Sequence, residues 1–439
     1  MSSIRYRIIA VSMVMAFILY LDRICLAEIV KSASFLGDVG LNKVQIGRLL
    51  GAFFFSYALF QVPAGWISDR LGGRGTLTAY IVLWSLFTAL TGMMSTFAGL
   101  LAMRLCCGMA EAGAYPTSNA LIRRWIPLAG RARASSMITV GGRLGGTLAP
   151  FITAWLVVSL GHWRPVLWID GAVGLAIAVL YWSVVRNRPA ERPDCDGAER
   201  ELIGQPPIEP RLAAQEILPM LRLFCRSRSL WFLSLLMFLV NVGWAYLVTW
   251  LPTYLKEQRH VEAVSGGRLV TLVLACGMIG QLCGGWFADW SVRRFGLRHG
   301  RRLALGTSGL VAGSGYLACL GMSSTWSMIL CFCAISFASD MGNPAMWAAM
   351  QDIGGRFTAA MTGWANMWGN FGSSVSALMV PALLVLGVGG LGQRYVFLAC
   401  ACALILSGVA ALGMDATKPV SGPIVDPGDD RVSLPATRA

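Results

Sequence analysis

Four ionisable residues stand out among those that lie inside apolar stretches of this sequence, where charged side chains are rare. Asp22 and Arg23 interrupt the first apolar run, and Arg104 and Glu111 lie in a later one at 97–122. At that depth in a membrane, a charged group must face the protein interior or a water-filled cavity. An acid there can exchange protons, and the planar guanidinium group of arginine suits a carboxylate. These residue types indicate transport of an anion together with protons.

The spacing within the later run supports this interpretation. Glu111 follows Arg104 by seven residues, so the two side chains share one helix face about 10 Å apart. The alternative is a set of permanent ion pairs that hold helices together, although such pairs contribute little net stability. Two acids and two bases in only two helices favour the functional interpretation.

The composition predicts the elements that position these residues. The chain is 56% hydrophobic and only 13% charged, with a mean hydropathy of +0.62. Such values are typical of an integral membrane protein. Apolar runs long enough to cross a bilayer recur at 8–30, 44–68, 75–95, 97–122, 134–160, 164–185, 230–256, 264–290, 303–323, 326–351, 357–387 and 392–414. The sequence therefore predicts an all-α membrane protein with about twelve transmembrane helices.

Basic residues predict how these helices are oriented. They concentrate at the start of the chain and in alternate connections, namely Arg5, Arg7, Arg70, Arg74, Arg123, Arg124, Arg131, Arg133, Arg293, Arg294, Arg298, Arg301 and Arg302. Cytoplasmic loops carry such an excess, which also explains the net charge of +14 without a nucleic-acid partner. We expect a multi-pass protein of the cell (inner) membrane with both termini in the cytoplasm.

Metal-dependent and enzymatic functions find no support in the sequence. Most of the twelve cysteines lie in apolar runs, where cysteine behaves as a small hydrophobic residue, and only three histidines are present. There is no P-loop, no H-E-x-x-H motif and no arrangement of a serine with a base. We therefore expect neither an enzyme nor a bound metal or cofactor.

The runs divide into two halves. A polar segment rich in proline and charge, RNRPAERPDCDGAERELIGQPPIEPR, separates six runs from the next six. The predicted units are an N-terminal six-helix bundle (1–190), a cytoplasmic linker (191–229), a C-terminal six-helix bundle (230–414) and a disordered cytoplasmic tail (415–439).

The two halves repeat one motif. GWISDRLGGRG begins at Gly65 and GWFADWSVRRFG begins at Gly285, an offset of 220 residues that also aligns Asp69 with Asp289. Parallel repeats of this kind predict two bundles related by an axis along the membrane normal.

The motif predicts contacts that change as a transporter switches between conformations. Gly65 permits close helix approach, and Asp69 can lie at the positive end of a neighbouring helix. Arg70 and Arg74 can pair with acids across the cytoplasmic interface, and Asp289 has the corresponding role in the second half. The alternative is an ordinary basic cytoplasmic loop, but recurrence of the motif favours gating.

With its two six-helix halves, its long linker and this loop motif, the chain resembles the major facilitator superfamily over nearly its whole length. Three helical segments are similar to the anion:cation symporters of that superfamily, namely YLDRICLA from Tyr20, SYALFQVPAGW from Ser56 and RLCCGMAEAGAYPTSNALIRRW from Arg104. That group contains proton-coupled carriers of galactonate, glucarate and hexuronates, and also carriers of glutamate and sialic acid.

The resemblance implies a role for each matching residue. Asp22 and Glu111 would exchange protons, Arg23 would hold the substrate carboxylate and Arg104 would couple to the acid. The residues that would touch the rest of the substrate are Tyr20, Tyr57, Trp347 and Asn366, with Asn241 and Tyr246 as further cavity residues.

Other polar residues of the apolar runs do not follow the family pattern. Arg143 stands where the sugar-acid carriers more often have a neutral polar residue, so it either faces the cavity as a second cation or pairs with an acid such as Glu111. Asp340 is a rival proton site. Asp170 and Arg164 are expected to form a local pair at the outer edge, and Pro344 is expected to break its helix.

These observations predict a secondary active transporter that uses alternating access to carry an organic anion, preferably a sugar acid such as a hexonate, hexuronate or aldarate, by proton symport. Its expected partners are the anion, protons and the lipid bilayer, and the family default is a monomer. The alternatives are an aromatic carboxylate, an amino acid, sialic acid or phosphate as substrate, coupling to sodium, and a membrane sensor that does not transport.

Overall fold

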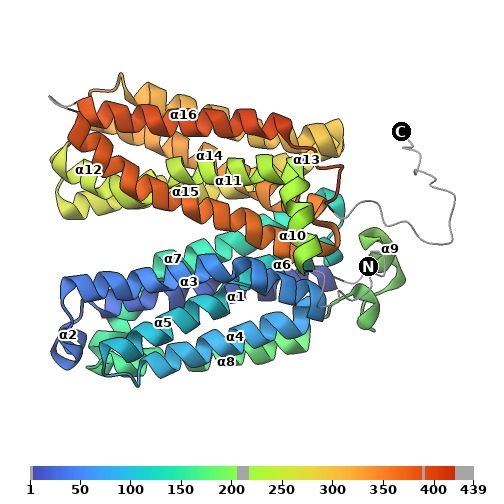
Figure 1. Ribbon diagram of the computed structural model, residues 1–439, viewed down its shortest axis with the longest axis horizontal. Coiled ribbons are helices and arrows are strands. Elements are labelled where there is room, and N and C mark those ends of the chain that lie inside the picture. The colour runs from blue at the N-terminus through green and yellow to red at the C-terminus, as the bar shows by residue number, and fades with distance from the viewer. Residues whose placement is uncertain (1–2, 205–216, 388–390, 421–439) are drawn as a thin grey trace.

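The computed structural model describes residues 3–204, 217–387 and 391–420. Its long helices form two bundles that lie side by side (Figure 1). The first bundle contains α1 (Ile4–Ile29), α3 (Lys43–Leu71), α4 (Gly73–Thr91), α5 (Phe97–Glu111), α6 (Ala114–Trp125), α7 (Arg131–Leu160) and α8 (Arg164–Val184). The second bundle contains α11 (Arg228–Ala245), η4 (Tyr246–Trp250), α12 (Leu251–Glu257), α13 (Ala263–Cys319), α14 (Thr325–Gly354), α15 (Thr358–Leu386) and α16 (Leu391–Gly413).

The number of membrane crossings agrees with the sequence. In the described part of the chain, nine helical segments are long and apolar enough to span a membrane. Two of them, at 265–319 and 325–386, are each long enough to cross twice. The first breaks at Gly296 and the second at Gly355, where positive φ angles of 75° and 54° interrupt the helix. With α4 included, the described helices account for the twelve predicted crossings.

Short elements connect the crossings. They are α2 (Ala33–Val39), η1 (Leu128–Gly130), η2 (Pro189–Glu191), α9 (Gly197–Ile203), α10 (Ile217–Arg226) and η5 (Gly355–Phe357). The linker helix α9 lies beside the start of α1, because the Glu199 carboxylate accepts hydrogen bonds from the backbone amides of Ile4 and Arg5 at 3.3 and 3.2 Å. At the start of the predicted tail, the Val420 amide donates to the Ile353 carbonyl at 2.8 Å. The rest of that tail lies outside the described residues.

Local sequence explains where several helices begin, but one predicted break is wrong. Asn42 and Gln45 form a capping box at the start of α3. Pro344 was expected to break its helix, yet α14 continues through it. A proline removes a single backbone hydrogen bond, and packing against neighbouring helices can hold such a helix together. In the second bundle, the regular α-helix is interrupted instead by the π-helical segment η4, which lies between α11 and α12.

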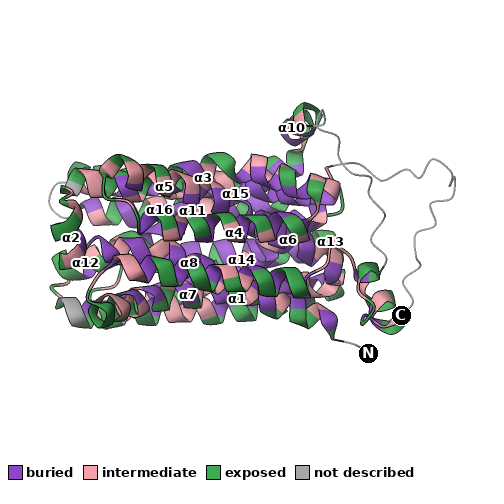
Figure 2. Ribbon diagram, turned by 90° about the horizontal axis from the view of Figure 1, so that it is seen from below, coloured by how far each residue is buried: buried purple, intermediate pink, exposed green. Residues whose placement is uncertain are grey.

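Large apolar side chains cover the outer faces of the bundles. Phe151 and Val158 of α7, Val179 of α8 and Leu378 of α15 are each more than 70% exposed. Figure 2 shows exposed residues along the outer faces of the long helices and buried residues between them. An apolar surface of this extent requires lipid as its surroundings.

The two bundles contact each other closely at one end, which we term the closed end. There α3 meets α15, and a Cβ atom added to Gly65 would lie only 2.5 Å from the Ala359 carbonyl oxygen. The repeat-related Gly285 of α13 packs on α7 in the same way, since its added Cβ would lie 2.9 Å from the Ser136 Cβ. In Figure 1 this end carries the N-terminus, α9 and α10. The helices α2 and α12 lie at the opposite end, which we term the open end.

Candidate functional site

A cavity of about 950 Å³ lies between the two bundles. Nine of the residues singled out from the sequence line it, namely Tyr20, Arg23, Tyr57, Arg104, Arg143, Asn241, Asp340, Trp347 and Asn366. Further lining residues such as Ala27 and Leu50 come from the half of the molecule nearer the open end. The cavity therefore combines cations and aromatic rings of the first bundle with polar and aromatic groups of the second.

Arg23 of α1, which lines this cavity, forms an ion pair with Glu111 of α5, which is buried and lies outside the cavity lining. The Arg23 guanidinium donates to Glu111 Oε2 from Nε at 3.1 Å and from Nη2 at 2.9 Å. The side chains are only 11% and 2% exposed. The rings of Tyr20 and Tyr57 flank the guanidinium group, with centroids 4.8 and 4.5 Å from Cζ. Neighbours on α1, α3 and α5 thus hold the Arg23 fork in one orientation.

Arg104 of α5 contacts the same region. Its Nη2 atom donates to the Arg23 carbonyl at 3.4 Å, and its guanidinium group lies 4.8 Å from the Phe53 ring centroid. Within the described residues, no carboxylate lies within ion-pair distance of Arg104. Arg104 therefore adds positive charge beside the Arg23 and Glu111 pair without neutralising it.

Asp22 lies behind this pair in the interior of the first bundle. Among the described residues, neither oxygen of its carboxylate has a hydrogen-bond partner, although the Trp84 indole lies close by. Glu111, Arg104 and Asp170 are near enough to act on it electrostatically. A buried carboxyl group without a fixed partner is suited to gain and lose a proton, because no ion pair has to break.

The placement of Asp170 corrects a prediction from the sequence. Arg164 forms an ion pair with Asp38 of α2 at 2.9 Å rather than with Asp170. Asp170 lies six residues into α8, about 9 Å from the end of the helix, and is only 5% exposed. Its neighbours include Cys25 and Asp22 of α1. The side chain therefore faces the interior of the bundle, not the outer edge.

Asp38 itself lies outside the membrane-spanning helices. Its Oδ2 atom accepts hydrogen bonds from Trp163 Nε1 and Arg164 Nε, both at 3.0 Å. Partial desolvation raises the pKa of this carboxyl group, but the hydrogen bonds and the positive charge of Arg164 outweigh that effect and leave the pKa below its usual value.

Arg143 of α7 pairs with Asp340 of α14, and so connects the two bundles. Its Nη2 atom lies 2.7 Å from Asp340 Oδ1. The Trp244 ring of α11 covers the guanidinium group at 4.8 Å. Arg143 thus lines the cavity, which was one prediction from the sequence. It also pairs with an acid, which was the alternative prediction, but that acid is Asp340 and not Glu111.

The second bundle contributes aromatic and amide groups. The Trp347 ring stacks on the Tyr115 ring at 5.4 Å, and Asn366 lines the cavity nearby. Asn241 also lines the cavity, but Tyr246 does not, because its hydroxyl accepts a hydrogen bond from Gln393 inside the bundle. Five residues turn an α-helix through about 140° beyond one full turn, so the two side chains point in different directions.

Tyr115 and Trp244 are cavity residues that the sequence analysis missed. Tyr115 links the first bundle to Trp347, and Trp244 covers Arg143. Helical spacing offered a signal for both, since Tyr115 follows Glu111 by four residues and Trp244 follows Asn241 by three. Each therefore shares a helix face with a residue already singled out.

At the closed end, two aspartates each cap a helix of the opposite bundle. Asp69 accepts hydrogen bonds from the backbone amides of Ala359 and Ala360, near the start of α15, at 3.0 and 2.8 Å. Asp289 accepts from those of Ala132 and Arg133, near the start of α7, both at 3.1 Å. Carboxylates at helix N-termini stabilise such contacts through hydrogen bonding and the helix dipole.

The arginines of the first motif have different partners from those expected. Arg74 donates to the Trp182 carbonyl from Nε at 3.1 Å and lies over the Trp182 ring at 3.7 Å. Arg70 lies over the Trp66 ring at 5.5 Å. Neither forms an ion pair across the bundles within the described residues, because aromatic rings and a carbonyl of their own bundle are nearer.

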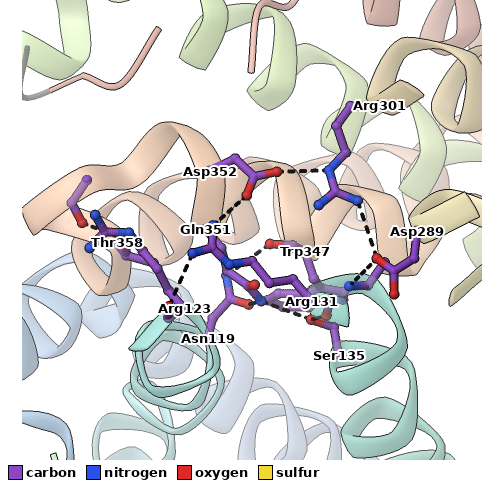
Figure 3. A network of polar contacts seen from close by, with 12 residues as sticks. Asn119, Arg123, Arg131, Ser135, Asp289, Arg301, Trp347, Gln351, Asp352 and Thr358 are labelled. Atoms are coloured by element: carbon purple, nitrogen blue, oxygen red, sulfur yellow. Dashed lines mark hydrogen bonds and ion pairs between the residues drawn. The ribbon is translucent and has the colours of Figure 1, made fainter. Parts of the chain in front are cut away.

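Other side chains form the expected acidic and basic contacts at this end. Asp352 of α14 accepts from Arg131 Nη1 at 2.7 Å and from Arg301 Nε at 2.8 Å, so it bridges α7 and α13 (Figure 3). Nearby, Gln351 donates to the Asn119 side chain of α6. These contacts close that end of the cavity.

Comparisons with known proteins decide the family. The model described as "Major Facilitator Superfamily" matches residues 12–377. The chain belongs to the Major Facilitator Superfamily.

Relatives within the superfamily include organic-acid transporters. The chain is 28% identical over 434 residues to the "Probable sulfoacetate transporter SauU" of Cupriavidus necator, covering 98% of each protein. It is 29% identical over 423 residues to the "D-galactonate transporter" of Escherichia coli O6:H1, covering 93% of this chain and 94% of that one. Among solved structures, the outward conformation of the transporter FucP aligns with a TM-score of 0.73 at 14% identity, covering 93% of this chain and 99% of FucP.

Membership of the superfamily agrees with the fold and the site. The two bundles and the membrane-spanning helices are those of a secondary transporter, and its relatives are transporters rather than enzymes. The chain is therefore a multi-pass membrane transporter of the superfamily, and its cavity is the place where a small-molecule substrate would bind.

Proposed function

We propose that this protein is a proton-coupled symporter of an organic anion, with sugar acids as the substrate class. It would work as a monomer in the cell membrane with both termini in the cytoplasm. The observation that carries this proposal is the ion pair between the cavity-lining Arg23 and the buried Glu111, with the unpartnered Asp22 behind it. These residues supply an anion-binding cation and two acids that can take up protons.

The charge distribution supports the orientation. Arg123, Arg131 and Arg301 lie at the closed end, and cytoplasmic loops carry such excess basic residues. The closed end is then cytoplasmic, and the cavity opens to the outside. The conformation described above would be the outward-facing state of an alternating-access cycle.

The Arg23 and Glu111 pair suggests how substrate and proton are coupled. A substrate carboxylate that binds Arg23 competes with Glu111 for the same guanidinium donors. Once displaced, a buried Glu111 without its cation is costly as an anion and accepts a proton. Binding of the anion thereby favours uptake of the proton. On the other side of the membrane, release of the anion favours release of the proton.

The lining of the cavity supports a hydroxylated substrate. Tyr20, Tyr57 and Asn366 contribute hydroxyl and amide groups to the lining of the cavity that also contains Arg23, and Trp347 offers an apolar ring face. Hydroxyl groups of a sugar acid would hydrogen-bond to the former, while its carbon skeleton packs on the latter. The galactonate and sulfoacetate named for relatives are likewise organic acids.

The test is transport by purified protein in liposomes. We expect the wild type to accumulate a labelled sugar acid against its gradient when the inside is alkaline. Glu111→Gln should retain exchange of substrate across the membrane but lose accumulation driven by the proton gradient. The matched control is Glu28→Gln, because Glu28 pairs with Lys31 near the end of α1 and away from the cavity lining.

Three outcomes would count against the proposal. Unchanged accumulation by Glu111→Gln would remove Glu111 from coupling. Accumulation that follows a sodium gradient and ignores pH would replace the proton as the coupling ion. Transport of benzoate, glutamate, sialic acid or phosphate in preference to galactonate, glucarate and glucuronate would replace the substrate class, and binding without any transport would favour a sensor.

A further inference from the structure

The Arg143 and Asp340 ion pair differs from the other contacts between the bundles. The pairs Arg131–Asp352 and Arg133–Asp289 lie at the closed end, where no substrate has to pass. Both members of the Arg143 and Asp340 pair line the cavity. Any ligand that occupies the cavity between the bundles therefore lies beside this pair.

The pair is well placed to be exchanged for a ligand. The Arg143 side chain retains 19% exposure toward the cavity, whereas Asp340 is only 3% exposed. Asp340 Oδ1 accepts from Arg143, but its buried Oδ2 has no hydrogen-bond partner within the described residues. An unpaired buried acceptor is costly, so the Asp340 carboxylate, with one oxygen unsatisfied, is a weak partner for Arg143. A ligand acid whose oxygens are all hydrogen-bonded would be a stronger partner for Arg143.

We propose that the substrate carries two acidic groups, and that its second acid binds Arg143 by displacing Asp340. This inference rests on the proposed function, in which the first acid binds Arg23. The ligand class is a small dianion, such as a sugar diacid or a short dicarboxylate, rather than a monoanion.

The position of Tyr115 relates the two cations to each other. Its hydroxyl group is buried, has no hydrogen-bond partner within the described residues and lies within electrostatic range of both Arg23 and Arg143. Gly142 is packed against this hydroxyl and against the Tyr20 ring. The two guanidinium groups thus lie on either side of one tyrosine that itself lines the cavity, so one ligand in this cavity can reach both.

Exchange of partners requires an additional proton. Arg143 keeps an anionic partner throughout, but a displaced Asp340 becomes a buried carboxylate without a cation and takes up a proton. The groups that face it are Arg143 from α7 and the Trp244 indole from α11, together with Ser336 and Gly277. None of these can replace the lost positive charge. A dianion would therefore enter with one more proton than a monoanion.

The experiment compares ligands that differ by one acidic group. Binding of galactarate against galactonate, and of succinate against succinamate, is measured on purified full-length protein by intrinsic tryptophan fluorescence. The wild type should bind each dianion at least tenfold more tightly than its monoanion. Arg143→Gln should weaken dianion binding about tenfold to a hundredfold more than it weakens monoanion binding, as expected for a lost hydrogen bond between charged groups.

Asp340→Asn separates this proposal from a purely structural ion pair. Removing the competitor should tighten dianion binding several-fold, opposite in sign to Arg143→Gln. A structural pair would instead give both variants the same loss for both ligands. The matched control pair is Arg164→Gln and Asp38→Asn, which breaks an ion pair outside the cavity and should change neither affinity.

The outcomes also distinguish this inference from the proposed function. Proton-driven transport of monoanions without preference for dianions would overturn the inference and leave the symporter intact. Dianion binding that depends on Arg143, combined with transport that does not respond to the proton gradient, would support the inference and overturn the proposed proton symport. Equal weakening of both ligands by the two variants, or no binding of either matched pair, would overturn the inference.

Discussion

Asp69 and Asp289 occupy equivalent positions in the two sequence repeats, and each caps the N-terminus of a helix in the opposite bundle. Asp69 receives the amides of the second and third residues of α15, and Asp289 receives those of the second and third residues of α7. The internal repeat is therefore visible not only within the bundles but also in the contacts that join them.

These two caps should stabilise the conformation in which the closed end is shut. We expect Asp69→Ala or Asp289→Ala to cost about 0.5–2 kcal/mol of that stability, a shift of about two- to thirtyfold in the conformational equilibrium. Ala377 lies on the exposed wall of the cavity, so an impermeant maleimide can label Ala377→Cys in the conformation whose closed end is shut. The rate of this labelling should fall in each aspartate variant by the same factor as the population of that conformation.

The control is a variant that removes a helix cap lying within a single bundle. Asn42 caps α3 within its own chain segment, so Asn42→Ala should leave labelling at position 377 unchanged. The same reduction in Asn42→Ala and in Asp69→Ala would mean that labelling reports general destabilisation. Full labelling in both aspartate variants would show that the caps do not set the equilibrium.

Arg23→Lys should weaken substrate binding about tenfold or more. Lysine is a point charge on a flexible stem and cannot reproduce the two donors that Arg23 directs at one oxygen, nor its packing between Tyr20 and Tyr57. Isothermal titration with the transported anion measures the change. Arg192→Lys in the linker, where Arg192 pairs with Asp194, is the matched control. Equal affinity in wild type and Arg23→Lys would exclude Arg23 from anion binding.

Asp22→Asn should separate coupling from stability. The Asp22 carboxylate has no partner within hydrogen-bond or ion-pair distance among the described residues, so its replacement breaks no ion pair and should change the free energy of unfolding by less than about 1 kcal/mol. Accumulation driven by a proton gradient should nevertheless be lost, because an amide cannot take up a proton. Thermal unfolding and gradient-driven uptake are measured on the same preparation. A large fall in melting temperature with normal uptake would assign Asp22 a structural role.

The Asp38 contact should stabilise the protein only when its carboxyl group is ionised. Because the pKa of Asp38 is lower in the folded protein, this contribution is complete above the unfolded-state pKa of about 3.9 and is lost as the pH falls through the lowered value. Asp38→Asn should therefore reduce the melting temperature at pH 7, and the difference from wild type should shrink toward zero in acid. A difference that is constant with pH would mean that packing of α2, not charge, is responsible.

The sequence was sufficient for the architecture because the bilayer imposes strong rules on composition. Apolar runs of about 20 residues, alternating basic loops and a repeat offset of 220 residues predicted the crossings and the two bundles. It also singled out Arg23 and Glu111, because ionisable groups inside a membrane helix are costly and rarely present without a reason.

Pairing of side chains was beyond the sequence. Arg143 had two possible environments, and only the approach of α14 to α7 gave it Asp340 as a partner. Asp170 was assigned to Arg164 by proximity in sequence, but helix geometry turned it inward and left Arg164 to Asp38. Both outcomes depend on contacts between residues more than 100 positions apart.

The sequence by itself thus determined which residues enter the membrane, since hydropathy and charge act on each segment separately. Only the tertiary structure decided which of them meet, and on which side of a helix each one lies. Arg164 illustrates this, because it pairs with Asp38, which is 126 positions away, and not with Asp170, which is six positions away. The physical reason is that ion pairs and cavities depend on the packing of helices from distant parts of the chain, which no local pattern encodes.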